Sequence, residues 1–437
     1  MAAAAVYFVF KETGQENAQT NQTAQWPQFG PDLENSGRSP YAGPKTNRVE
    51  WVFKQGVTEC GFESSMSSPV VDKNGSIYFT NTEGALVALS PEKKVLWKYK
   101  IPDAYQRDNC DSGSDEAAAI YDYNIDFAPV MDKEGIVYFG TSGIKNDKRI
   151  YAVKDGRELW RFNIDGPLKS PIKISNGNDL YFATNKTLYV LNRADQRNYK
   201  TFSLGIPGAS TIALSQDGTV YACRSRSLIA LTADLKVKWR NENLGELRNC
   251  HLAVNPDTGI IYLPAGNQGK LYAISPKGVI QWTADIFWSE ASPSVAEDGT
   301  IYVAATDISK EIERCKNIKE TDGALIALDS AGLEKWKFYV PPVLLEEETK
   351  EGGEECYDNR RAIDAKPIIG KDGVIYFGTD ASAFFALNAD GTEKWRLGTA
   401  ETGVPVDEFD NAAVISSDGT MYVSTRGGFR GAIFAIK

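Results

Sequence analysis

Side chains that could bind a metal ion gather most densely in the stretch DNCDSGSDE, at residues 108–116. Carboxylate oxygens are ligands that Ca²⁺ prefers, so this stretch could hold a calcium ion. Its spacing does not match an EF-hand loop, and a solvated acidic loop is the competing interpretation. The candidate calcium ligands are Asp108, Asp111, Asp115 and Glu116.

The chain contains one histidine, His251, which directly follows Cys250. A nucleophilic triad would also need an aligned serine and acid, which the sequence cannot show. The many loop acids could supply a carboxylate pair for glycoside cleavage, but no spacing singles out two of them. We therefore interpret His251 as a satisfied polar residue, name no catalytic residue and favour a protein without enzymatic activity.

Six cysteines occur, none of them in a CxxC, a CxxCH or an adjacent pair, so zinc ribbons, thioredoxin-like sites and covalent haem are unsupported. They fall into three neighbouring couples beside long loops. We predict one disulfide in each couple, although 15 pairings are formally available. Disulfides would place the protein in an oxidising compartment, and isolated loop thiols are the alternative. The predicted pairs are Cys60–Cys110, Cys223–Cys250 and Cys315–Cys356.

The composition is that of a soluble globular protein, with 42% hydrophobic and 24% charged residues over 437 positions. The formal net charge is −10 and the pI is about 5.0, which argues against nucleic acid as a partner. The apolar start MAAAAVYFVF is too short to span a bilayer and lacks a basic n-region. We favour slightly its interpretation as a remnant of a signal or anchor packed on the side of the propeller, and an assembly strand is the alternative. We expect no transmembrane span.

One sequence unit recurs along the chain: an apolar pair, a turn such as Asn-Gly or Asp-Gly, an apolar-Tyr-apolar run, a second apolar run, and a closing Trp strand. Four short strands in a period of about 40 residues are typical of a propeller blade. The marker tyrosines are Tyr78, Tyr138, Tyr181, Tyr221, Tyr262, Tyr302, Tyr376 and Tyr422. The closing residues are Trp97, Trp160, Phe202, Trp239, Trp282, Trp336 and Trp395.

Ring closure fixes the number of blades. The eighth unit ends at its third strand, GAIFAIK, and an orphan Trp strand around Trp51 precedes the first unit. Placing that strand as the outer strand of the last blade completes the ring and covers an otherwise exposed edge. The sequence predicts an all-β, eight-bladed propeller of four-stranded antiparallel blades over residues 26–437, preceded by an apolar segment and polar linker over residues 1–25.

The blade ending ALSPEKKVLWKY and the lead-in WPQFGPDLENSGRSPYAGP resemble the PQQ-like, quinoprotein-type repeat propellers, of the BamB-like or uncharacterised extracytoplasmic kind. The resemblance runs from Trp26 to Lys437. It implies that the outer-strand Trp docks between blades. The family includes dehydrogenases, assembly-factor lipoproteins and uncharacterised surface proteins, so the resemblance is specific for fold rather than for function.

A PQQ-dependent dehydrogenase is the sharpest hypothesis that this resemblance allows. It would require a Trp floor under the quinone, a Ca²⁺ held by Glu, Asn and Asp, and usually a lid of two adjacent cysteines. No adjacent pair of cysteines exists here. We therefore do not expect PQQ, and we expect no cofactor other than Ca²⁺ at the acidic stretch.

All long insertions fall in the links between blades or in second-to-third strand loops, which share one face of a propeller. Residues 103–126 contain seven acids and one base, and residues 341–364 contain eight acids and three bases, so the acidity belongs to this face. Loops on a rigid scaffold usually carry function. The links place these candidate binding residues around the channel mouth: Asp126, Arg248, Trp288, Glu290, Arg361, Asp364, Phe409, Asp410 and Asn411.

These observations lead to three functional hypotheses. The leading one is a non-catalytic, extracytoplasmic propeller that binds a protein or glycan partner, or scaffolds an assembly, through its acidic, disulfide-bonded face. The second is a subunit of a surface filament or layer that joins other copies by strand addition. The third is an enzyme that uses PQQ or Ca²⁺. The strand-forming residues of the second hypothesis are Val6, Tyr7, Phe8, Val9 and Phe10.

Overall fold

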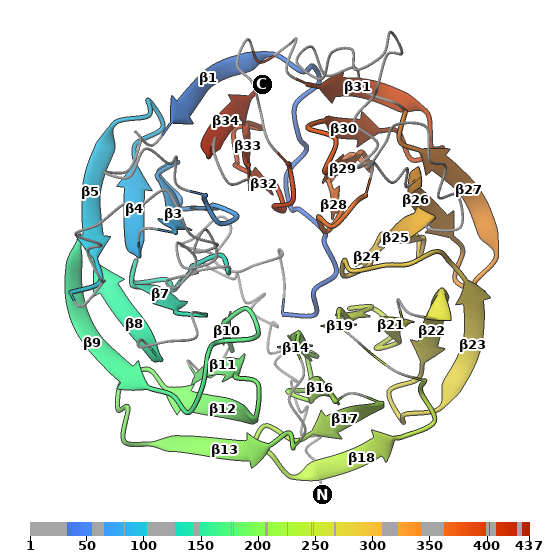
Figure 1. Cartoon of the computed structure of the whole chain (residues 1–437), viewed down its shortest axis with the longest axis horizontal. Coiled ribbons are helices and arrows are strands. Elements are labelled where there is room, and N and C mark those ends of the chain that lie inside the picture. Colours follow the sequence, from blue (N-terminus) through green and yellow to red (C-terminus); the bar gives the residue numbers. More distant parts are fainter. Residues whose placement is uncertain are drawn as a thin grey trace, which may run out of the picture.

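The computed structural model shows eight four-stranded antiparallel sheets arranged as a ring, which confirms the predicted eight-bladed propeller (Figure 1). The structure describes residues 33–437 except for 55–64, 83, 103–126, 143–147, 176, 178, 206–208, 225, 246, 248, 266–267, 308–321, 342–361, 399–401, 403–407 and 426–430. The described part contains no helix long and apolar enough to cross a membrane. The predicted boundary at residue 25 lies outside it and stays a prediction.

Each blade runs from an innermost strand beside the axis to an outer strand at the rim. The strands of the first four blades are β2 (Val70–Val71), β3 (Ile77–Asn81), β4 (Ala85–Leu89) and β5 (Val95–Lys100) in blade 1; β6 (Val130–Met131), β7 (Val137–Gly140), β8 (Arg149–Lys154) and β9 (Arg157–Asn163) in blade 2; β10 (Lys173–Ile174), β11 (Asp179–Ala183), β12 (Thr187–Asn192) and β13 (Tyr199–Ser203) in blade 3; and β15 (Ile212–Leu214), β16 (Val220–Arg224), β17 (Ser227–Leu231) and β18 (Val237–Asn241) in blade 4.

The remaining strands are β20 (Ala253–Val254), β21 (Ile261–Ala265), β22 (Lys270–Ile274) and β23 (Ile280–Asp285) in blade 5; β24 (Ser294–Val295), β25 (Ile301–Asp307), β26 (Asp322–Leu328) and β27 (Glu334–Tyr339) in blade 6; β28 (Ile368–Ile369), β29 (Ile375–Gly378), β30 (Phe384–Leu387) and β31 (Glu393–Leu397) in blade 7; and β32 (Val414–Ile415), β33 (Met421–Ser424), β34 (Ala432–Ile436) and β1 (Val49–Lys54) in blade 8. A further parallel pair, β14 (Ala209–Ser210) and β19 (Asn249–Cys250), joins the links that enter blades 4 and 5.

The repeated Tyr and Trp of the sequence meet within each blade. In blade 1 the rings of Tyr78 and Trp97 lie 5.8 Å apart and tilted, and the same pair recurs in six further blades. Innermost and middle strands are buried on both faces, whereas outer strands such as β23 alternate between partly buried and exposed residues. The period-2 pattern of the outer strand therefore marks the rim of the ring.

Closure follows the prediction made from the orphan Trp strand. Strand β1 pairs antiparallel with β34 and forms the outer strand of blade 8, with Trp51 opposite Ala435. The ring of Trp51 lies 5.8 Å from that of Tyr422, as in the other blades. The two ends of the propeller are thus joined in one sheet, in which β1 covers the edge of β34.

The outer-strand tryptophans also dock on the following blade, as the resemblance implied. At several of these junctions the indole N–H donates to a carbonyl in the turn between the third and fourth strands of the following blade. Four junctions have this bond: Trp51 to Pro91 at 3.0 Å, Trp239 to Pro276 at 2.8 Å, Trp282 to Ser330 at 3.0 Å, and Trp336 to Ala389 at 2.9 Å.

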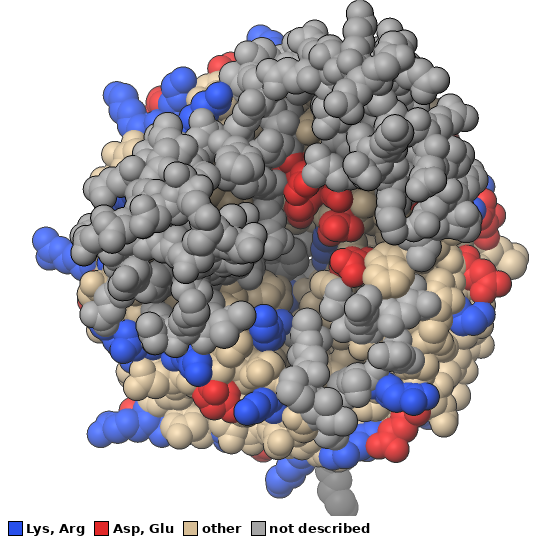
Figure 2. Space-filling model, in the orientation of Figure 1, with Lys and Arg blue, Asp and Glu red and all other residues tan. Residues whose placement is uncertain are grey.

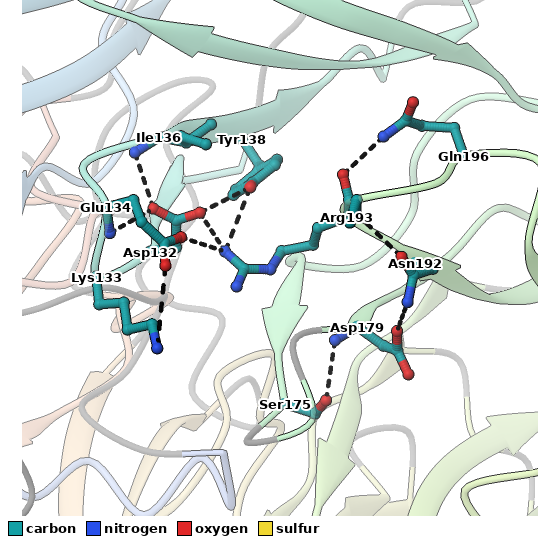
Figure 3. Close-up of polar contacts among 11 residues, drawn as sticks. Asp132, Lys133, Glu134, Ile136, Tyr138, Ser175, Asp179, Asn192, Arg193 and Gln196 are labelled. Atoms are coloured by element: carbon teal, nitrogen blue, oxygen red, sulfur yellow. Dashed lines mark hydrogen bonds and ion pairs between the residues drawn. The ribbon is translucent and has the colours of Figure 1, made fainter.

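Blades 2 and 3 are joined by a buried ionic contact, which we call the clasp (Asp132, Tyr138 and Arg193; Figure 3). Arg193 follows β12 and reaches the first turn of blade 2, where its guanidinium pairs with the Asp132 carboxylate. The Tyr138 hydroxyl donates to the same carboxylate at 2.8 Å, and Arg193 lies over the Tyr138 ring. Only 9% of the Arg193 side chain and 2% of the Asp132 side chain are exposed.

The segment from Leu33 to Pro44, which we call the strap, crosses the middle of the ring from blade 4 to blade 8 (Figure 1). From the sequence, these residues were expected only to resemble an entry segment. Strap carbonyls accept the backbone N–H of the last residue of four innermost strands. These bonds are Leu214 to Leu33 at 3.0 Å, Val254 to Glu34 at 2.8 Å, Val295 to Ser36 at 2.8 Å, and Ile369 to Gly37 at 2.9 Å.

Candidate functional site

Carboxylates gather at the centre of one face of the ring, where the space-filling view shows a hollow with acidic atoms at its edge (Figure 2). Four acids that interact electrostatically come from segments next to the innermost strands of blades 7 and 8. Asp364 lies in the link that enters β28, Asp380 follows β29, and Glu408 and Asp410 lie in the link that enters β32. We call these four residues the acidic rim.

Backbone hydrogen bonds hold the three segments of the acidic rim together. The Asp380 N–H donates to the Ala362 carbonyl at 3.1 Å, and the Phe409 N–H donates to the Thr379 carbonyl at 3.1 Å. A Cβ at Gly378 would lie 2.0 Å from the Phe409 carbonyl oxygen, so only glycine permits this close approach. The link into blade 8 is therefore seated directly on the second strand of blade 7.

The same link is anchored to blade 1 on its other side. The Asn411 amide donates to the Met66 carbonyl at 2.7 Å, and the Ala412 N–H donates to the Ser68 hydroxyl at 3.0 Å. Phe409 is fully buried and packs edge-on against Phe384. Of the predicted channel-mouth residues on this link, Phe409 and Asn411 thus fix the backbone of the link against blades 7 and 1. Asp410 belongs to the acidic rim.

Burial, followed by the charges of Asp364 and Asp410, raises the pKa of Asp380 to about 10. Asp380 therefore carries a proton at neutral pH and shares a hydrogen bond with Asp410. Its Oδ1 is buried without a hydrogen-bond partner among the described residues. The arrangement combines a neutral carboxyl with neighbouring carboxylates, so it favours cationic groups and hydrogen-bond donors.

The remaining predicted channel-mouth residues are divided between blade 6 and the undescribed part of the chain. Trp288 and Glu290, both partly buried, lie in the link that enters β24, and the Thr306 N–H donates to the Trp288 carbonyl at 2.6 Å. Ser289 between them is bonded to the Ala304 carbonyl at 2.7 Å. Asp126, Arg248 and Arg361 lie outside the described residues.

One predicted disulfide is present in the described part. Cys223 at the end of the second strand of blade 4 is bonded to Cys250, with a Cα–Cα distance of 5.8 Å and a sequence separation of 27. Both residues are buried. Cys60, Cys110, Cys315 and Cys356 lie outside the described residues, as do the candidate calcium ligands at 108–116 and the strand at 6–10.

His251 lies beside this disulfide, with its Nδ1 at 3.4 Å from the Thr211 hydroxyl. Burial lowers the pKa of His251 to about 4, so the ring is neutral at neutral pH. Across the described residues, no group of three or more His, Cys, Asp or Glu is placed to hold a metal ion.

Sequence reasoning missed Asp380 and Glu408. Asp380 is the second residue after the buried strand β29, and a charged residue directly after such a strand on the loop face is a usable signal. Glu408 directly precedes the link residues that the sequence did single out. What the sequence could not show is that both converge with Asp364 and Asp410.

The fold and the site define an eight-bladed β-propeller with an acidic hollow on one face. A family model described as the outer membrane protein assembly factor BamB matches residues 146–306. No curated protein matches the chain. The family match, with the structures below, confirms the resemblance to PQQ-like repeat propellers.

Two solved structures support the fold. A quinohemoprotein alcohol dehydrogenase from Comamonas testosteroni is 13% identical, with a TM-score of 0.65 over 96% of this chain and 81% of the other. BamB from Moraxella catarrhalis is also 13% identical, with a TM-score of 0.54 over 89% of this chain and 98% of the other. At this identity the likeness shows a shared fold and leaves function open.

Proposed function

We propose that the chain is a non-catalytic, extracytoplasmic binding and scaffolding module, and that the acidic rim is its binding site. The acidic rim carries this proposal, because four carboxyl groups from three segments interact there, and acidic atoms lie at the edge of the central hollow (Figure 2). Concave sites with a few convergent polar groups are where ligands usually bind. The buried Cys223–Cys250 disulfide supports an oxidising compartment.

The chemistry of the rim favours a basic partner. Ionised carboxylates attract Lys and Arg side chains, and partial desolvation in the hollow strengthens that attraction. Asp380 uses its proton in the hydrogen bond to Asp410 and adds no negative charge, so the attraction comes from Asp364, Glu408 and Asp410. A lysine- or arginine-rich protein segment fits this chemistry better than a glycan, which is neutral or acidic in most cases. The match to an assembly factor family agrees with a protein partner.

Fluorescence anisotropy with a fluorescein-labelled octalysine peptide tests the proposal on the full-length, oxidised protein. The rim variant combines Asp364→Asn, Glu408→Gln and Asp410→Asn. We expect it to bind the peptide at least about tenfold more weakly at low salt, which corresponds to about 1.4 kcal/mol.

A control variant separates the rim from bulk charge. It combines Asp217→Asn, Asp234→Asn and Asp285→Asn, which remove three exposed acids at the periphery and change the net charge equally. We expect its affinity to stay within about twofold of the natural protein, since exposed charges are screened by salt. If both variants bound the peptide equally weakly, the peptide would be responding to net charge alone. The acidic rim would then not be the binding site.

A further inference from the structure

We propose that the strap is the closing element of the propeller: it seals the axial hollow at the end opposite the acidic rim and replaces a turn that blade 8 lacks. The hollow is then a well with one mouth. A ligand could then enter the hollow only from the side of the acidic rim, which bears on the proposed function. The role of the strap rests on its own contacts, however, and is tested without any ligand.

The position of the strap along the axis follows from its backbone bonds. Leu214, Val254, Val295 and Ile369 are the last residues of β15, β20, β24 and β28, and the next residue of each begins a tight turn. The acidic rim lies at the other end of these strands. Asp364 lies four residues before the first residue of β28, whereas the strap bonds to the last residue of that strand, so the strap and the rim lie toward opposite ends of β28.

The strap binds the innermost strands as an added strand would. Innermost strands present unpaired N–H and C=O groups toward the axis, and the strap pairs with them across blades 4 to 7. Its side chains add further bonds: the Asn35 amide donates to the Ile212 carbonyl at 3.0 Å and to the Leu252 carbonyl at 3.2 Å. Arg38 donates through Nε to the Val295 carbonyl at 2.8 Å.

The strap also reaches the link that carries Asp364. The buried Lys366 ammonium donates to the Asn35 carbonyl at 2.6 Å, and Lys366 is only 4% exposed. A lysine this deeply buried is costly unless its N–H groups are bonded. The Asn35 carbonyl therefore covers a cation beneath the link, and removal of the strap would open it to water.

At blade 8 the strap replaces a missing turn. At the four junctions described above, the indole donates to the turn between the third and fourth strands of the following blade. In blade 8 these two strands, β34 and β1, come from opposite ends of the propeller and no turn joins them. The Trp395 indole N–H instead donates to the Pro44 carbonyl at 3.3 Å. Gly43 lies against Tyr376, where a Cβ would be 2.5 Å from the hydroxyl.

Two glycines with the same backbone conformation give a matched test. Gly37 and Gly135 both have φ of +78°, so alanine strains the backbone equally at both. A Cβ at Gly37 would lie 2.2 Å from Ser294 Oγ and 3.0 Å from the Pro367 carbonyl, whereas a Cβ at Gly135 meets nothing within 4 Å. Gly37→Ala therefore pushes the strap off blades 6 and 7, and Gly135→Ala is the control.

Hydrogen–deuterium exchange of the full-length protein reads the outcome. We expect Gly37→Ala to speed exchange at least tenfold in peptides containing Leu214, Val254, Val295 and Ile369, with no change at β2 of blade 1. Gly135→Ala should leave all of these peptides as they are. Reaction with N-hydroxysuccinimide acetate gives a second readout, in which Lys366 becomes reactive in Gly37→Ala alone.

Asn35→Gly keeps the test decisive if Gly37→Ala does not fold, because it removes two bonds without a clash and glycine accepts the φ of +60° at this position. It should speed exchange at Leu214 and Val254. Unchanged exchange in the strap variants, or the same increase in Gly135→Ala, would overturn the proposal. So would rapid acetylation of Lys366 in the natural protein, since a sealed floor must protect that amine.

Discussion

Replacement of Arg193 by alanine tests how strongly the clasp holds blades 2 and 3 together. The change leaves the Asp132 carboxylate buried without its cation. Removal of one partner from a buried ion pair costs about 3–5 kcal/mol. The carboxylate keeps three donors, from the Tyr138 hydroxyl at 2.8 Å and from the backbone N–H groups of Glu134 and Ile136 at 2.9 Å. We therefore expect a loss near the lower end, about 3 kcal/mol.

The unfolding temperature converts this free energy into an observable. Unfolding entropy is about 2.1 cal/mol/K per residue, so 3 kcal/mol lowers the midpoint of this 437-residue chain by about 3 °C. Differential scanning calorimetry and urea unfolding followed by tryptophan fluorescence both measure the change. The urea midpoint should fall while its slope stays constant, because the surface exposed on unfolding is unchanged.

Two control variants show whether the cost comes from the buried charge. Arg197→Ala removes an arginine of the same turn whose side chain is 92% exposed, and we expect no measurable change. The double variant Asp132→Asn with Arg193→Met removes both charges, so it should be more stable than Arg193→Ala alone. A loss below about 1 kcal/mol for Arg193→Ala, or a double variant less stable than the single one, would refute the reasoning.

Two further predictions concern the disulfide and the acidic rim. Reduction of Cys223–Cys250, or Cys223→Ser with Cys250→Ser, should lower the unfolding free energy by about 3.5 kcal/mol for a separation of 27. Urea unfolding with and without reductant measures the loss, and equal midpoints would contradict it. Folding raises the pKa of Asp380 to about 10, so its contribution favours the native state below pH about 4 and is lost as pH rises toward 10. Asp380→Asn should therefore stabilise the protein increasingly from pH 5 to 9 in thermal unfolding, and a difference that does not vary with pH would count against the shift.

The eight blades could be predicted because their signals are local and repeated. The turn, Tyr and Trp positions recur with a period of about 40 residues, and the orphan strand at Trp51 had one vacant place in the ring. The pairing of Cys223 with Cys250 was accessible for the same reason, since blade spacing places the second strand of one blade beside the link to the next.

The strap and the clasp could not be predicted, because their contacts join distant parts of the chain without a repeating pattern. The strap binds mainly through backbone carbonyls, which carry no side-chain signature, and Asn35 reaches Leu252 across 217 residues. Arg193 lies in a turn of mostly polar and charged residues, which from the sequence would be expected to be exposed to solvent. The pKa of Asp380 depends on burial and on charges from other links, which only the folded ring defines.

The most direct test of the account is a hydrogen-exchange footprint of the octalysine peptide on the full-length protein. The account predicts protection in peptides that cover residues 362–380 and 408–412, with none at the turn that follows Leu214 or at the outer strands β5 and β18. Loss of this protection in the rim variant would show that the acidic rim is the binding site of the peptide. Protection confined to the outer strands, or to the turns beside the strap, would contradict it and move the binding surface away from the acidic rim.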